Sequence, residues 1–172
     1  MALRYLSDAQ SAMILALVAA GSAGERQEIP VGAVLRDAAG RFLAACGNSR
    51  IAAVDPTGHA EIHALRQAAT RLGNDRLGGT GLTVTLEPCS MCLAALAMAR
   101  VAYVRYEAKN FLPNQEEERL DVYHQLPAEE ESDFDLNDDN SYVNNNIDAF
   151  FNQSGVDAGL LLRIFFDKRR QI

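Results

Sequence analysis

The spacing of hydrophobic residues predicts helices and strands along most of the chain. Apolar residues that recur every three to four positions are typical of amphipathic helices, and short β-branched or alternating runs are typical of strands. A first helix is expected to open at a capping box, Ser7 to Gln10, and to end near Gly21 or Gly24. Further helices are expected at residues 59–72, 90–100 and 160–170, and strands at residues 29–36, 41–47, 82–86 and 101–106.

This order of elements predicts a three-layer α/β domain. The first two strands are joined by residues 37–40, whose sequence Asp-Ala-Ala-Gly is typical of a hairpin turn. Strands that then alternate with helices indicate an α/β/α arrangement, in which helices cover both faces of a mixed sheet. We expect the sheet to be antiparallel at the hairpin and parallel beyond it.

Composition supports a folded domain with an acidic segment in it. Of the 172 residues, 48% are hydrophobic and 23% are charged, which excludes a wholly disordered or coiled-coil chain. The net charge is −7, but residues 1–112 carry eleven positive and nine negative side chains, whereas residues 113–162 carry one and thirteen. Residues 127–153, rich in Asp and Asn, are expected to form a surface insert within a single domain spanning 1–172. Whole-chain acidity therefore does not exclude nucleic acid as a partner.

The first helix and the cysteine count bear on localisation. An apolar run at residues 12–20, followed by small residues, superficially resembles a signal peptide, but the preceding capping box favours a helix of the folded domain. No run reaches the roughly 18 to 20 apolar residues of a membrane span. Three cysteines, an odd number, do not make a disulfide framework, which indicates a reducing compartment. We expect a cytoplasmic protein without a membrane segment.

Two short motifs, each at the expected start of a helix, hold the residues best suited to bind a metal. His59 and Glu61 form a His-x-Glu motif. Cys89 and Cys92 follow Pro88 in a Pro-Cys-x-x-Cys motif. Two thiolates and one imidazole suit Zn²⁺, and three protein ligands leave the fourth tetrahedral position for water, as in catalytic zinc sites. Such a water needs a nearby carboxylate to accept its proton, a role that Glu61 can fill if the site lies over the N-terminal end of the helix.

Other interpretations of these residues remain open. A closed structural zinc site would need a fourth ligand, which Cys46 or His63 could supply. A redox-active Cys-x-x-Cys pair would leave His59 and Glu61 without a role. The sequence favours the catalytic site, with Cys46 as a core thiol on one strand face and His63 as an uninvolved or pocket-edge residue.

Together, His-x-Glu and Pro-Cys-x-x-Cys make the chain resemble the zinc-dependent nucleobase deaminases, for which this combination is the known signature. The resemblance is to the cytidine deaminase superfamily and, within it, to the bacterial-type tRNA-specific adenosine deaminases. It covers about residues 5–109 and resumes over the C-terminal helix. The segments that carry it are 29–35 (Ile-Pro-Val-Gly-Ala-Val-Leu), 47–48 (Gly-Asn), 55–62 (Asp-Pro-Thr-Gly-His-Ala-Glu-Ile), 84–92 (Val-Thr-Leu-Glu-Pro-Cys-Ser-Met-Cys) and 165–170 (Phe-Phe-Asp-Lys-Arg-Arg).

This resemblance implies a fold, a cofactor and a reaction. The implied fold is a mixed five-stranded sheet flanked by helices, in a homodimer. Zinc would be held by His59, Cys89 and Cys92. Glu61 would move protons and Asn48 would bond the base. The implied reaction is the hydrolytic deamination of adenosine to inosine at the wobble position of the tRNA anticodon loop.

The substrate is the point at which the chain departs from the family pattern. Residues 106–112 read Tyr-Glu-Ala-Lys-Asn-Phe-Leu, where the family usually has Arg-Asp-x-Lys-Thr-Gly-Ala near its RNA-facing side. Lys168, Arg169 and Arg170 in the basic tail are the candidate RNA contacts. Two alternatives are a deaminase of a free purine base or nucleoside, such as guanine, and a catalytically silent, zinc-bearing, RNA-binding partner subunit, which the intact Glu61 disfavours.

Overall fold

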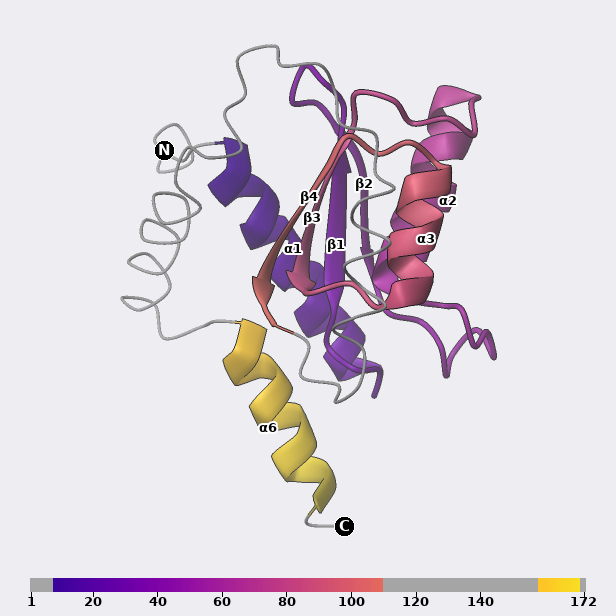
Figure 1. Cartoon of the computed structure of the whole chain (residues 1–172). Coiled ribbons are helices and arrows are strands. Elements are labelled where there is room, and N and C mark those ends of the chain that lie inside the picture. The colour runs from indigo at the N-terminus through magenta and orange to yellow at the C-terminus, as the bar shows by residue number, and fades with distance from the viewer. Residues whose placement is uncertain (1–7, 110–157, 171–172) are drawn as a thin grey trace.

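The computed structural model describes residues 8–109 and 158–170 (Figure 1). Its elements follow the predicted order of helix, two strands, helix, strand, helix, strand and C-terminal helix. They are α1 (Asp8–Glu25), β1 (Gly32–Arg36), β2 (Phe42–Gly47), α2 (Ala60–Leu72), β3 (Gly81–Leu86), α3 (Ser90–Met98), β4 (Tyr103–Ala108) and α6 (Ala158–Arg170). The acidic insert predicted at residues 127–153 lies outside the described residues.

The strands form one mixed sheet in the order β2-β1-β3-β4. β1 pairs antiparallel with β2, as the hairpin predicted, but it also pairs antiparallel with β3, and only β3 and β4 are parallel. The prediction of parallel pairing throughout the region beyond the hairpin is therefore wrong. After the crossover through α2, β3 runs in the same direction as β2. However, β3 joins the sheet beside β1, on the side away from β2. Because β1 runs in the opposite direction, its pairing with β3 is antiparallel. Within residues 8–109 and 158–170 the sheet has four strands, and the implied fifth strand is not among them.

Helices cover both faces of this sheet, which confirms the three-layer α/β/α prediction. Successive residues of a strand point to opposite faces. In β1, Val34 packs with α1, whereas Ala33 and Leu35 belong to the larger core that includes residues of α2 and α3. Figure 1 shows α1 on one side of the strands and α2 and α3 on the other. The C-terminal helix α6 contacts α1 and β4.

Small residues allow α1 to lie unusually close to the sheet. A Cβ atom at Gly32 would stand 1.9 Å from the carbonyl oxygen of Ala16, and one at Gly47 would stand 2.5 Å from that of Ala19. Contacts this short do not occur between real atoms, so both strand positions require glycine. The alanine-rich stretch that superficially resembles a signal peptide therefore has a packing role in the folded domain.

The end of α3 differs from the predicted boundary. This helix ends at Met98, two residues before the predicted limit, because Arg100 adopts a left-handed conformation with φ of 60°. The N–H of Val101 then donates to the carbonyl of Leu96, and the fully buried Val101 enters the core. As a result β4 begins at Tyr103 and not at residue 101. Among the helices that the structure describes, none is long and apolar enough to cross a membrane.

Candidate metal centre

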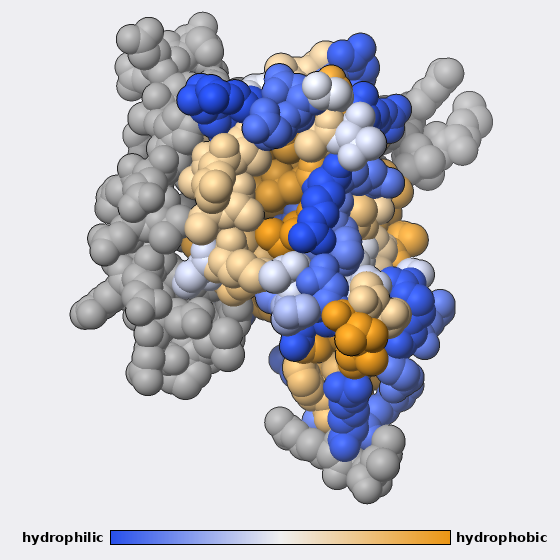
Figure 2. Space-filling model, turned by 90° about the vertical axis from the view of Figure 1, so that its right-hand side faces the viewer, coloured by the Kyte–Doolittle hydropathy of each residue, from blue (hydrophilic) through white to orange (hydrophobic). Residues whose placement is uncertain are grey.

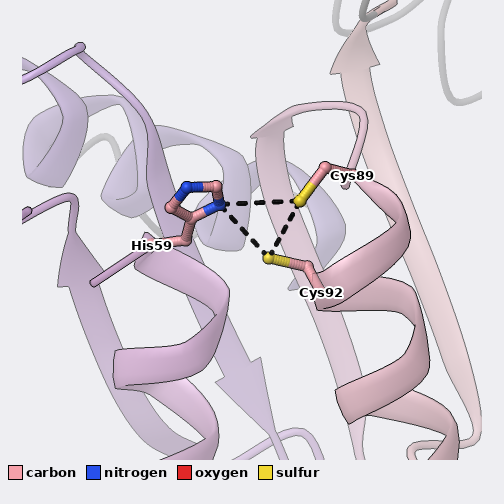
Figure 3. Close-up of side chains that lie close together, drawn as sticks. All are labelled: His59, Cys89 and Cys92. Atoms are coloured by element: carbon pink, nitrogen blue, oxygen red, sulfur yellow. Dashed lines mark hydrogen bonds between the residues drawn. The ribbon is translucent and has the colours of Figure 1, made fainter. Parts of the chain in front are cut away.

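The predicted metal ligands stand at the N-terminal ends of two neighbouring helices. His59 is the N-cap of α2 and Cys89 is the N-cap of α3, and both have extended backbone angles. Cys92 follows in the first turn of α3. Neither side chain makes a capping hydrogen bond to its own helix, and Figure 3 shows both directed toward the space between the helices. The positive end of a helix dipole also favours thiolates at this position.

The distances among the three ligand atoms fit a zinc ion. Nδ1 of His59 lies 3.6 Å from Sγ of Cys89 and 3.5 Å from Sγ of Cys92, and the two sulfurs are 3.7 Å apart (Figure 3). Zinc bonds of about 2.3 Å to sulfur and about 2.05 Å to nitrogen, at a tetrahedral angle, require separations of about 3.8 Å between two sulfurs and about 3.6 Å between sulfur and nitrogen. The side chains are therefore already arranged as three corners of a zinc tetrahedron.

A fourth protein ligand is not found in the described part of the chain. His59, Cys89 and Cys92 are the only His, Cys, Asp or Glu residues there whose ligand atoms form a group suited to a metal. Cys46 is instead half-buried against the core, with Sγ 3.4 Å from Oε1 of Gln67. The geometry of the described residues thus favours an open, catalytic type of site over the closed structural site that the sequence left open.

Contacts within the cluster shift the pKa of each ligand. Hydrogen bonds with Cys92 and, to a smaller extent, with the His59 ring together lower the pKa of the Cys89 thiol to about 4. The same sulfur contact raises the pKa of Cys92, because this thiol would have to ionise next to a thiolate. The hydrogen bond with Cys89 also raises the pKa of His59. Cys89 is therefore the thiol that ionises most easily. A bound cation would displace the protons that Cys92 and His59 hold.

Glu61 lies against this cluster from the first turn of α2. Its side chain is buried, and burial raises the pKa of its carboxyl group, whereas the positive charge of His59 lowers it. The Cys92 thiol lies close enough to influence the ionisation of this carboxyl group. A carboxyl group whose pKa is raised holds a proton more readily than an exposed one, which suits a group that must both accept and release a proton.

Asn48 makes a contact that the sequence did not predict. Its Oδ1 accepts a hydrogen bond of 2.9 Å from the N–H of Ala60, and its Nδ2 donates one of 3.0 Å to the carbonyl of Ile29. The side chain is buried and joins the end of β2 to the start of α2. A side-chain amide has two N–H donors, so one remains for a further acceptor.

The turn before His59 is fixed by an aspartate. Asp55 accepts hydrogen bonds from the backbone N–H and the hydroxyl of Thr57, and it forms an ion pair with Arg66 at 3.2 Å. The hydrogen bonds from Thr57 are the main reason that the pKa of Asp55 is lowered to about 2. The hydrogen bond and the positive charge of Arg66 make smaller contributions to the same shift. The N–H of His59 in turn donates to the carbonyl of Thr57. Asp55 thereby stabilises the turn that places the imidazole.

Two other predicted features lie apart from the three ligands. A groove of about 720 Å³ runs between α2 and the end of β2. His63, Arg66 and Arg71 line it, and none of the three candidate metal ligands does.

In the basic tail, Lys168 and Arg169 are exposed on α6. Arg169 lies 4.9 Å above the Phe165 ring and donates to the carbonyl of Gln27. The side chain of Arg170 lies outside the described side chains.

One buried acid escaped the sequence analysis. Glu28 is 1% exposed, and its carboxylate accepts hydrogen bonds from the backbone N–H groups of Arg50, Ile51 and Ala52. An acidic residue between a helix and a β-rich run is ordinary in sequence, and nothing in its spacing indicates three backbone partners more than twenty residues away.

Comparison with known proteins agrees with this geometry. The family model described as the cytidine and deoxycytidylate deaminase zinc-binding region matches residues 6–108. The tRNA-specific adenosine deaminase of Agrobacterium fabrum is 51% identical over 98 residues, which is 57% of this chain and 64% of that protein. The match therefore spans less than two thirds of the relative's length.

Solved structures give the same picture. A chain from a study of A-to-I editing by tRNA:A34 deaminases superimposes with a TM-score of 0.57 at 50% identity, over 58% of this chain and 72% of that one. Guanine deaminase from Bacillus subtilis shares the fold, with a TM-score of 0.55 at 23% identity, over 70% of this chain and 96% of that one. The match of the family model over more than half of the chain, together with the His59, Cys89 and Cys92 geometry, means that the chain belongs to the cytidine and deoxycytidylate deaminase zinc-binding family.

Proposed function

We propose that the chain hydrolytically deaminates adenosine to inosine at the wobble position of the tRNA anticodon loop. The observation that carries this proposal is the 51% identity over 98 residues to a tRNA-specific adenosine deaminase, in a chain whose described residues include the His59, Cys89 and Cys92 cluster. A single-stranded loop is a suitable substrate, because an unpaired base can leave the stack and enter a pocket at low cost.

Zinc is the cofactor that the cluster suits, and His59, Cys89 and Cys92 would hold it. Their spacing and their ionisation support this assignment. When bound, Zn²⁺ supplies a Lewis acid that lowers the pKa of a water molecule.

Glu61 is the proposed catalytic acid and base. Its carboxylate accepts a proton from the attacking water and delivers protons to ring N1 and then to the departing amino group. The water oxygen bonds to C6, the bond between C6 and the amino nitrogen breaks, and ammonia leaves with inosine as the other product. The burial that raises the pKa of Glu61 supports this role, because the group is then able to hold the proton between the two transfers.

Asn48 and the basic tail are the proposed substrate contacts. The second N–H of the Asn48 amide is free to bond the purine, while the rest of the side chain holds the start of α2. Lys168, Arg169 and Arg170 at the end of α6 would meet the phosphates of the RNA. The exposure of Lys168 and Arg169 is consistent with this contact.

We further propose a single cytoplasmic domain that forms a homodimer. Three cysteines without a disulfide suit a reducing compartment. Figure 2 looks onto the side on which α2 and α3 lie in Figure 1, and apolar side chains gather there between polar ones. Met98 on α3 is 84% exposed and Leu72 on α2 is 46% exposed, so this face supports an interface between two copies.

A substrate panel tests the proposed function. The zinc-loaded protein is incubated with an anticodon stem-loop, adenosine, guanine and cytidine, and ammonia release is measured for each. We expect release from the stem-loop at a far higher kcat/KM than from any free base or nucleoside. Release from guanine alone would replace the assignment with a free-purine deaminase, and no release from any substrate would favour the silent partner subunit.

A further inference from the structure

The loop that follows β2 is held in one shape by the buried Glu28. Three consecutive backbone N–H groups, of Arg50, Ile51 and Ala52, point to its carboxylate at 3.1, 2.9 and 2.9 Å. Hydrogen bonds to an ionised acceptor are roughly twice as strong as neutral ones. A carboxylate that is 1% exposed is therefore satisfied by a single loop, and the loop depends on that carboxylate for its shape.

This loop is connected directly to the metal centre. The N–H of Ser49 donates to the carbonyl of Gly58, the residue before His59, and the N–H of Asp55 donates to the carbonyl of Arg50. The positive charge of Arg50 lies close enough to act on the His59 ring. Residues 49–54 are therefore joined by backbone hydrogen bonds to the turn that carries His59.

The outer surface of the loop is unusual for a solvent-exposed segment. Ile51 is 59% exposed and Val54 is 88% exposed, and Arg50 is exposed next to them. Val54 has φ of 51°, a left-handed conformation that a β-branched residue adopts only at an energetic cost. Two aliphatic side chains and a guanidinium are thus displayed on a strained, firmly held loop beside a catalytic site. Apolar side chains can contact the face of an unstacked base and arginine can contact phosphate.

We propose that Glu28 is a positioning residue that preorganises residues 49–54 to contact the nucleotides flanking the reacting adenosine. The inference rests on the proposed RNA substrate, and it assigns Glu28 no part in the chemical step. Preorganisation lowers the entropic cost of binding, so its loss should appear in the affinity for RNA and not in the rate of the bound complex.

The sign of the charge effect separates this role from simple electrostatics. Glu28→Gln removes one negative charge, which by repulsion alone would strengthen RNA binding. It also replaces one acceptor oxygen by an NH₂ group that faces backbone donors. We expect KM for a zinc-dependent reaction on the anticodon stem-loop to rise about tenfold, which corresponds to the loss of one charge-assisted hydrogen bond, with kcat changed less than about twofold. Glu28→Asp, which keeps the carboxylate, should recover part of the loss.

Two controls complete the experiment. Glu25→Gln removes the same charge from an exposed side chain at the end of α1 and should leave KM unchanged or slightly lower. Ile51→Ala alters only the displayed surface and should raise KM without lowering thermal stability. Combined with Glu28→Gln, the Ile51→Ala substitution should raise KM little further, because both variants lose the same contact.

In the wild type, amide hydrogen exchange of residues 50–52 should be slow, and Glu28→Gln should accelerate it at least tenfold.

The results distinguish this inference from the proposed function. If the wild type produces inosine from the stem-loop but Glu28→Gln or Ile51→Ala keeps the wild-type KM, the role of Glu28 is overturned and the proposed function stands. Unchanged amide exchange in Glu28→Gln would also overturn it. If Glu28→Gln does not fold, the KM of Ile51→Ala alone decides. If the wild type acts only on a free purine, both proposals fail together.

Discussion

The backbone N–H of Ala60 donates a 2.9 Å hydrogen bond to the side-chain oxygen of Asn48, which ties the end of β2 to the first residue of α2. His59 and Glu61 lie on either side of Ala60 in the sequence. A single amide therefore orients the segment that carries a candidate metal ligand and the proposed acid–base group. This gives Asn48 a structural function in addition to its proposed contact with the base.

Two substitutions of Asn48 should separate these functions. Asn48→Ala leaves the buried N–H of Ala60 without an acceptor, so the free energy of unfolding should fall by about 1 to 3 kcal/mol. Asn48→Asp keeps the acceptor and loses the donor, so it should retain more stability but lose substrate affinity. Urea unfolding and KM for the stem-loop measure the two effects. Equal stability of the two variants would show that the bond to Ala60 does not hold α2.

Loss of a ligand should remove the metal and destabilise the fold together. Wild-type protein is expected to contain one zinc per chain by elemental analysis, and Cys89→Ala close to none, because two protein ligands bind zinc far more weakly than three. Its melting temperature should fall as well, since metal binding contributes folding free energy. The matched control is Cys46→Ala, which should keep its zinc. A zinc-free Cys46→Ala protein would instead indicate a fourth protein ligand.

The turn before His59 gives a prediction on pH. The pKa of Asp55 is lowered from 3.8 to about 2 in the folded protein by hydrogen bonds from Thr57 and, after those, by Arg66. Because the folded pKa is below the unfolded one, the ionised carboxylate stabilises the fold above pH 3.8, and this contribution is lost as the pH falls toward 2. Asp55→Asn should therefore be less stable than wild type at pH 6, and the difference should shrink between pH 4 and pH 2. Urea unfolding of both proteins at each pH measures it, and a difference that does not vary with pH would contradict the assignment.

The basic tail should appear in the salt dependence of RNA binding. Each phosphate contact on a single strand adds about −0.7 to the slope of log K against log salt. Replacing Lys168 and Arg169 with alanine should therefore make the slope about 1.4 less steep if both contact phosphates. Arg76→Ala serves as the control. It removes an exposed charge that follows the C-terminal end of α2, whereas His59 lies at the N-terminal end of that helix. An unchanged slope in the double variant would mean that neither Lys168 nor Arg169 contacts a phosphate.

The sequence predicts the local placement of the candidate metal ligands better than it predicts the topology of the sheet. The spacing of Cys89 and Cys92 places both sulfurs at one end of a helix, and this local relationship is confirmed by the structure. The pairing of β1 with β3 depends on which side of the hairpin the returning chain joins, and no local pattern contains that information. Glu28 was missed for the same reason, because its partners, Arg50 to Ala52, are brought to it only by the folded sheet.

The most direct test of the account compares the zinc-loaded wild type with Glu61→Gln on a full-length tRNA. Inosine at the wobble position is quantified by mass spectrometry under single-turnover conditions, with zinc content and unfolding measured on the same samples. The account predicts that Glu61→Gln retains one zinc and a wild-type fold yet forms inosine about 10² to 10⁴ times more slowly, the loss expected for a positioned acid–base group. Near-normal formation of inosine by zinc-loaded Glu61→Gln would contradict it.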